Sequence, residues 1–111
     1  MEIRSVIKYA RMSPKKVHTV ARSVVGMPAE KALQLLKLIN KKSAYLLAKT
    51  LASAMANAEC KNVGSASLYV KDAIAEQGFS LHRSIPAARG SAHPIRKRTS
   101  HIKVILTDNL K

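Results

Sequence analysis

The chain has 111 residues, with 20 Lys and Arg against 6 Asp and Glu, so its formal net charge at pH 7 is +14. The length suits one domain and is too short for two independent cores, while a hydrophobic share of 47% is enough for a packed core and excludes a disordered basic tail. The single cysteine, Cys60, excludes an intramolecular disulfide and fits a reducing compartment. No stretch approaches the ~20 apolar residues of a membrane span, and residues 1–17 lack the apolar block of a secretory signal peptide.

The first predicted elements are a strand near residues 2–9 and a helix that begins at Ser13-Pro14. A serine before a helix can accept a hydrogen bond from a free backbone N–H group, and proline is tolerated at the first helical position. Gly26 is the expected stop for this helix. Its predicted buried stripe consists of Val17, Val20, Ala21 and Val24. Its predicted basic face consists of Lys15, His18 and Arg22.

Two further helices are predicted next. One begins at Pro28, and the other runs roughly over residues 42–61, where Asn40 or Ser43 could cap it. The many alanines of the longer helix favour helix formation and allow close packing. The predicted core-facing residues of the two helices are Ala32, Leu35, Leu36 and Ile39, then Ala44, Leu47, Ala48, Leu51, Met55 and Ala58.

Strands are expected in the last part of the chain. A loop over residues 62–67 precedes β-structure from Leu68, and residues 102–107 alternate in the manner of a strand. Between them lies the segment 79–100, which is either a long irregular loop or a β-hairpin that turns near Arg89-Gly90-Ser91. We favour the hairpin, because structureless loops of this length are uncommon in compact domains.

Such a hairpin must project from the rest of the chain. From Phe79 to Gly90 a strand would extend ~36 Å, whereas a compact domain of this size has a radius of gyration of only ~13 Å. The apolar content of the segment is too thin for a second core, so the arm is expected to become ordered inside a polyanionic partner. Pro86 and Pro94 are expected to limit regular pairing near its end.

The charge is distributed unevenly. Two long windows contain no acidic residue, one between Glu2 and Glu30 and the other between Glu76 and Asp108. A cationic excess of this size costs stability by self-repulsion unless a polyanion offsets it. Two acid-free windows therefore favour polyanion binding over a merely solvated face. Composition alone leaves RNA, DNA and an anionic membrane surface open.

The residue patterns expected of an enzyme are missing from the sequence. The glycines are isolated, so no phosphate-binding glycine loop exists, and the acidic residues are too scattered for a catalytic pair. Cys60 is expected to be a packing or surface residue. Together with His82, His93 and His101 it matches no compact zinc module. We therefore expect no enzymatic activity, no cofactor and no metal.

Structured RNA is the favoured polyanion. Guanidinium groups suit phosphate and base contacts better than ammonium groups do, and a projecting arm would bind by folded shape. The arm's arginines are Arg83, Arg89, Arg96 and Arg98. One alternative is a DNA-architectural protein whose basic β-arm wraps a duplex, with Pro86 or Pro94 wedging a base step. Another is a cationic membrane-surface helix, which the Ala-rich third helix suits poorly.

Three stretches carry a family resemblance. The first is Arg11-Met-Ser-Pro-Lys-Lys-Val17, followed by Gly26. The second begins at Lys41-Lys42-Ser-Ala44 and ends at Asn57-Ala58-Glu59, and the third leads from Arg83 through Arg89-Gly90 to Lys97-Arg98-Thr99-Ser100-His101-Ile102. Together they span nearly the whole chain, and they resemble the bacterial large-subunit ribosomal protein L-twenty-two family. The chain departs from that pattern at His18, Val25 and Ala87, where the family commonly has basic residues.

The resemblance implies an α+β fold in a single domain, residues 1–111. Three helices packed on a small antiparallel three-stranded sheet would form a body (1–78 and 101–111), with a long protruding β-hairpin arm (about 79–100). The implied function is that of a structural protein of the large ribosomal subunit, which binds 23S rRNA, supports subunit assembly and lines the nascent-peptide exit tunnel with its arm. The implied partners are 23S rRNA, neighbouring large-subunit proteins including the L-four family, and the nascent peptide. The implied location is the cytoplasmic ribosome, without membrane association; an organellar ribosome is the alternative.

Two sets of site residues follow when the resemblance is carried onto this chain. The expected rRNA-binding residues are Arg11, Lys15, Lys16, Arg22, Lys41, Lys42, Arg83, Arg89, Arg96, Lys97, Arg98 and His101. The expected tunnel-lining tip of the arm is Pro86, Ala87, Ala88, Arg89, Gly90, Ser91, Ala92 and His93.

Overall fold

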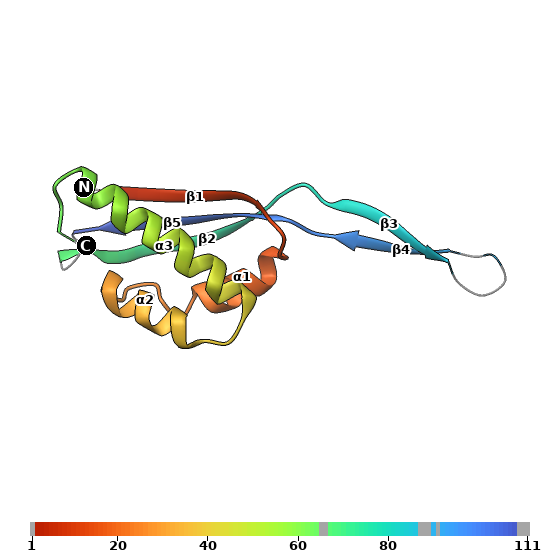
Figure 1. Ribbon diagram of the computed structural model, residues 1–111, viewed down its shortest axis with the longest axis horizontal. Coiled ribbons are helices and arrows are strands. Elements are labelled where there is room, and N and C mark those ends of the chain that lie inside the picture. Colours follow the sequence, from red (N-terminus) through yellow and green to blue (C-terminus); the bar gives the residue numbers. More distant parts are fainter. Residues whose placement is uncertain (1, 65–66, 87–89, 91, 109–111) are drawn as a thin grey trace.

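The computed structural model describes residues 2–64, 67–86, 90 and 92–108, with the backbone alone for Ala92 and His93. In chain order the elements are β1 (Glu2–Ala10), α1 (Pro14–Ala21), α2 (Ala29–Leu38), α3 (Lys42–Cys60), β2 (Tyr69–Gln77), β3 (Leu81–Pro86), β4 (Ala92–Lys97) and β5 (Ser100–Thr107). They form a body of helices and strands from which a thin two-stranded arm extends (Figure 1). The expected α+β fold with a protruding hairpin is confirmed.

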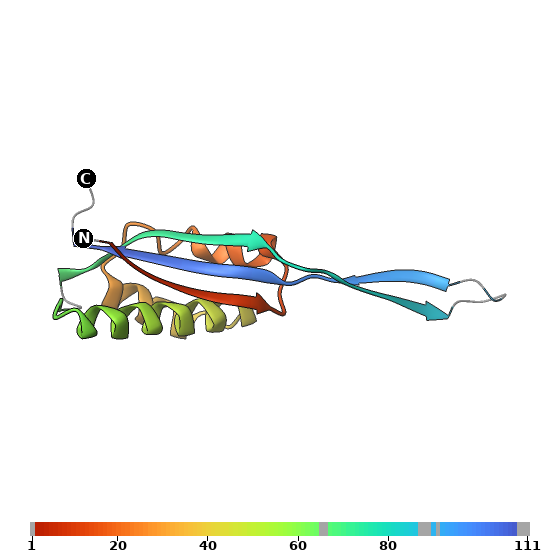
Figure 2. The same cartoon turned by 90° about the horizontal axis from the view of Figure 1, so that it is seen from above.

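The body is built on an antiparallel sheet with the strand order β1-β5-β2. Helix α3 lies against β1 and β5, and α1 lies against β2, so the helices cover one face of the sheet (Figures 1 and 2). Alternate residues of β5 point into this layer, and Ile102, Val104 and Leu106 are buried there. The period-2 pattern of the C-terminal strand therefore predicted its buried face correctly.

The helical stripes predicted from apolar spacing form most of the core. The four residues predicted for α1 and its C-terminal turn are all buried. In α3 the predicted residues are buried except Met55, which is half-buried. In α2 Leu35 lies at the edge of the core, as does Ile39, which follows the end of the helix at Leu38. None of the helices in the described part of the chain combines the length and hydropathy that a membrane crossing needs.

Helix α1 is shorter than expected. It ends at Ala21, and a run of turns replaces the last predicted helical turn before Gly26. The Ser23 hydroxyl donates to the Val20 carbonyl at 2.7 Å, and the Ser23 and Val24 N–H groups bond three residues back. These bonds compete with helical pairing. Gly26 has a φ of 88° and its N–H donates to the Val70 carbonyl at 2.8 Å, so it ties the turns to β2.

The predicted side-chain caps are wrong. Ser13 occupies the N-cap position of α1, but its side chain makes no capping hydrogen bond. Helix α3 has Lys41 at its N-cap, and neither Asn40 nor Ser43 caps it. Lysine has no acceptor atom to offer the free N–H groups. Both helices also lack an acidic residue in their first turn, so their starts are electropositive.

The arm is a separate two-stranded ladder. Strands β3 and β4 pair without interruption from Leu81 opposite Lys97 to Pro86 opposite Ala92. The molecule measures 62 × 24 × 22 Å and its radius of gyration is 16.9 Å, which exceeds the ~13 Å of a compact domain of this length. The projection predicted from strand length is therefore confirmed.

The expectation that proline would limit pairing in the arm is wrong for the described residues. Pro94 lies opposite Ser84 within the ladder, and Pro86 forms its last described pair. Each strand of a two-stranded ladder has one free edge, where a missing N–H costs no interstrand hydrogen bond. At the expected turn, Gly90 has a left-handed φ of 72°, while Arg89 and Ser91 lie outside the described residues.

The chain passes from body to arm through a close contact between Gly78 and Thr99. The Gly78 N–H donates to the Thr99 carbonyl at 2.9 Å, and the Thr99 hydroxyl donates to the Phe79 carbonyl. A Cβ atom on Gly78 would lie 2.7 Å from Thr99 Oγ1 and 3.3 Å from the Thr99 carbonyl oxygen. Glycine is therefore required here by the close approach of the two strands.

Replacing Gly78 is predicted to loosen this junction. Gly78→Ala should lower the free energy of unfolding by about 1–3 kcal/mol, because the new methyl group must displace Thr99. Urea denaturation measures this change. Gly64→Ala is the matched control, because a Cβ there has no neighbour within 4 Å. Equal stability of the two variants would show that the strands do not approach as closely as described.

A leucine pair tests the packing of the helices. Leu47 of α3 is fully buried, whereas Leu38 of α2 is 83% exposed. Leu47→Ala should cost about 2–5 kcal/mol in unfolding free energy, because it removes buried surface and leaves a cavity. Leu38→Ala should change it by no more than about 0.5 kcal/mol. Comparable losses in the two variants would contradict the assigned core.

Candidate nucleic-acid interface

The turn between β1 and α1 is fastened to the base of the arm. Ser100, the first residue of β5, is completely buried and its hydroxyl donates to the Met12 carbonyl at 2.8 Å. The Met12 N–H in turn donates to the Ala10 carbonyl at 2.8 Å. These bonds hold Arg11, in the β1–α1 turn, beside the residues that lead from β4 into β5.

A groove lies where the arm meets the body, and we call it the root groove. Its lining residues come from the β1–α1 turn, α1, the start of α3 and the end of β4. They are Arg11, Met12, Ser13, Lys16, Lys42, Arg96, Lys97 and Arg98. No acidic side chain belongs to this lining. Residues from distant parts of the chain thus form one cationic surface. Half of the predicted rRNA-binding residues belong to it.

The cations of the root groove have no anionic partner among the described residues. The Lys42 ammonium donates to the Arg11 carbonyl at 3.0 Å. By contrast, Lys71 pairs with Glu2 at the far end of the sheet, where its hydrogen bond and charge lower the pKa of the Glu2 carboxyl. Unpaired like charges held together repel, and an anion bound between them removes that cost.

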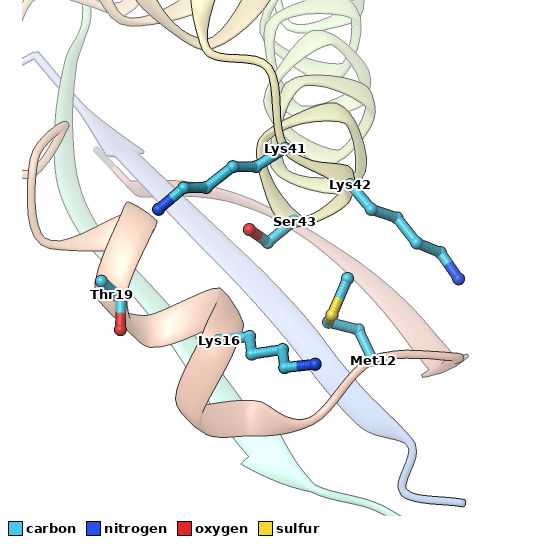
Figure 3. A pocket seen from close by; sticks show the side chains of 6 residues that line it. All are labelled: Met12, Lys16, Thr19, Lys41, Lys42 and Ser43. Carbon is cyan, nitrogen blue, oxygen red and sulfur yellow. The ribbon is translucent and has the colours of Figure 1, made fainter.

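A second hollow adjoins the root groove between α1 and the start of α3, and we call it the helix-start hollow. It is lined by Met12, Lys16, Thr19, Lys41, Lys42 and Ser43 (Figure 3). Met12, Lys16 and Lys42 belong to both depressions, so the basic surface is continuous from the arm to α3.

The predicted basic face of α1 lies on the other side of that helix. Lys15, His18 and Arg22 line a shallow depression together with Pro14, Thr19 and Ala75. The helical spacing therefore placed these three residues correctly. Helix α1 carries cations on both flanks, with Lys16 in the root groove and Lys15 and Arg22 in the depression beside β2.

Two other predicted rRNA-binding residues lie apart from these depressions. Arg83 is exposed on the arm, opposite Ile95, and its guanidinium donates to the His82 carbonyl at 2.9 Å. His101 is half-buried at the base of the arm, where its Nδ1 accepts a hydrogen bond from the Tyr9 N–H at 3.2 Å. The two rings also make an edge contact, with centroids 4.8 Å apart. Only Nε2 of His101 is therefore left for an outside partner.

The predicted tip is described only in part. Pro86 and Gly90 are exposed, and the backbones of Ala92 and His93 pair with Pro86 and Ile85. The other expected tip residues, which are Ala87, Ala88, Arg89 and Ser91, lie outside the described residues.

Several lining residues were not among the predicted site residues. They are Met12, Ser13, Thr19 and Ser43. Ser13 and Ser43 stand at helix starts, where the sequence pattern suggests capping and not a surface role. The described part of the chain contains no cluster of three or more His, Cys, Asp or Glu side chains that could hold a metal ion. The lining residues provide hydrogen-bond donors and positive charges, which suit the binding of anions.

Comparison with known proteins identifies the family of the chain. Residues 5–107 match the family described as ribosomal protein L22p/L17e. A relative from Akkermansia muciniphila is 49% identical over 109 residues, which cover 97% of each chain, and one from Opitutus terrae is 50% identical over 97% of this chain and 96% of its own. A Thermus thermophilus relative is 45% identical over 96% of this chain and 95% of its own. All three are named large ribosomal subunit protein uL22.

The match extends over nearly the whole chain, including the body, the root groove and both strands of the arm. This agrees with the family resemblance that the sequence motifs indicated, and with the expectation of a structural protein instead of an enzyme. The chain belongs to the ribosomal protein L22p/L17e family of large-subunit ribosomal proteins.

Proposed function

We propose that this protein binds 23S rRNA in the large subunit of the cytoplasmic ribosome, as a single domain whose arm is inserted among folded RNA segments. The observation that carries the proposal is the root groove, an acid-free cationic surface located where the arm leaves the body. An RNA that lies in this groove contacts the body and the arm at once. The bacterial origin of the named relatives supports the cytoplasmic ribosome over an organellar one.

The arm suits a partner that surrounds it. Its described side chains are exposed or half-buried, and Ile85 is 52% exposed although it is apolar. An isolated two-stranded hairpin is marginally stable in water. Contacts on both faces with RNA would stabilise the arm, and the bound arm would in turn hold RNA segments together. This is how the protein would support assembly of the subunit.

The remaining partners follow from the family resemblance and the reach of the arm. The molecule is 62 Å long and the arm extends well beyond the helices of the body (Figure 1). We propose that its tip lines the peptide exit tunnel, next to a protein of the L-four family and in the path of the nascent peptide. Arg83 and the cations at the arm base would fix the arm on rRNA behind this tip.

Removing two groove arginines should weaken RNA binding in a salt-dependent way. Arg96→Ala combined with Arg98→Ala should lower affinity for a 23S rRNA fragment about tenfold or more. The slope of log affinity against log salt concentration should decrease by about 2, because two phosphate contacts are lost. Filter binding at several salt concentrations measures both quantities.

The matched control replaces two exposed lysines of α2, Lys31→Ala with Lys37→Ala, which removes the same charge outside the groove. It should retain the wild-type affinity within about threefold. An arginine variant that behaves like this control would contradict the assigned interface. Duplex DNA that competes as well as the rRNA fragment would favour the DNA-architectural alternative instead.

A further inference from the structure

The start of helix α3 presents unused hydrogen-bond donors. Its N-cap residue, Lys41, has an extended backbone and provides no capping acceptor. The first helical hydrogen bond is made by the Tyr45 N–H to the Lys41 carbonyl at 3.2 Å. The preceding N–H groups of Lys42, Ser43 and Ala44 have no acceptor among the described residues. Free N–H groups and the helix dipole together favour an anion at this position.

Ser43 adds an independent observation. Only 3% of this residue is exposed, yet its hydroxyl has no hydrogen-bond partner in the described chain. Figure 3 shows the hydroxyl oxygen pointing away from the α3 ribbon into the helix-start hollow. Among the described residues no fully buried side-chain oxygen or nitrogen lacks a partner, so the Ser43 hydroxyl is the part of this residue that opens into the hollow.

The usual internal partner of such a hydroxyl is missing for Ser43, because it would lie outside the helix. A hydroxyl inside a helix commonly donates to the carbonyl four residues earlier. Thr50 of the same helix does so, because its hydroxyl donates to the Leu46 carbonyl at 2.9 Å. The corresponding acceptor for Ser43 would be the carbonyl of Ile39, but Ile39 precedes α3 in extended backbone and its carbonyl bonds the Lys41 N–H at 3.0 Å. The turn before α3 therefore leaves the Ser43 hydroxyl available to a ligand.

Positive charge surrounds the same space. Lys41 extends from the start of α3 across the hollow, and Lys16 lines it from α1, whereas Lys42 turns outward (Figure 3). Lys42 is engaged with the Arg11 carbonyl. Backbone N–H groups, a hydroxyl donor and two ammonium groups form the donor set that suits a tetrahedral oxyanion such as phosphate.

We propose that the helix-start hollow binds a single phosphate group of the RNA backbone, with the Ser43 hydroxyl and the N–H groups of residues 42–44 as its donors. The identity of the anion as an RNA phosphate rests on the proposed function, whereas the oxyanion site itself rests on α3 and Ser43. Because the hollow is continuous with the root groove, the bound phosphate would anchor one end of an RNA segment that continues toward the arm.

Titration of the full chain with inorganic phosphate, followed by amide NMR, tests the site. The resonances of Lys42, Ser43 and Ala44 should shift and saturate. Ser43→Ala should weaken the affinity about three- to tenfold through the loss of one hydrogen bond. Ser53→Ala is the matched control, since Ser53 lies exposed on the same helix. Shifts that do not saturate, or equal affinity in the two variants, would overturn the proposal.

A second variant separates loss of binding from loss of structure. Lys41→Asp places a capping carboxylate at the N-cap, where it should occupy the same N–H groups and raise the melting temperature while abolishing phosphate binding. Lys31→Asp on α2 makes the same charge change outside the hollow and should keep phosphate binding. Saturable phosphate binding by the Lys41→Asp variant would overturn the site.

Binding to a 23S rRNA fragment distinguishes this proposal from the proposed function. Weaker binding of Ser43→Ala than of Ser53→Ala supports an RNA phosphate in the hollow. Equal and tight RNA binding by both overturns the RNA assignment but leaves the root groove and the proposed function intact. Phosphate binding in a chain that has no affinity for rRNA overturns the proposed function and the RNA assignment together.

Discussion

Strand β5 is the element on which the other features depend. It pairs with β1 on one side and β2 on the other, and its buried face supports α3. Its first residue, Ser100, bonds the β1–α1 turn, and the residues just before it belong to the arm. A single strand therefore fixes the core, the position of the arm and the place of Arg11 next to Arg96. The root groove forms at the start of β5, because the arm, the β1–α1 turn and the helices come together there.

The second constraint is charge. The chain carries a net charge of +14 around a small core of helix and sheet residues. Among the described residues, the cations of the root groove have no anionic partner. The starts of α1 and α3 add to this field, because neither has a side-chain cap or an acidic first turn. Internal neutralisation would stabilise the free protein but would remove its affinity for a polyanion. The folded chain thus keeps its electrostatic cost unless a polyanion neutralises it.

Local patterns were sufficient to predict much of this structure. Apolar spacing identified the buried stripe of α1 and the core residues of α3, and strand length predicted that the arm would project. Three features depended on local backbone hydrogen bonding that apolar spacing does not reveal. The Ser23 hydroxyl ended α1 early, the free edges of the hairpin accommodated Pro94, and the turn before α3 removed the expected role of Ser43 as a cap.

The candidate site was likewise predictable from the sequence only in part. The basic residue types and the acid-free windows were visible in the sequence, and Lys15, His18 and Arg22 were correctly assigned to one face. The meeting of Arg11 and Lys42 with Arg96–Arg98 could not be predicted, because these residues come from distant parts of the chain and converge only through β5. Arg89 and its tip neighbours remain predictions.

The most direct test of the account is the behaviour of the protein in a sucrose gradient after a wash with ~0.5 M salt, a level that releases contacts made by charge alone. An arm inserted into folded rRNA and a body bound at the root groove predict that an immunoblot will find the protein with the large subunit. Release to the top of the gradient would contradict the account, because it would mean that the protein is held only by exposed charge.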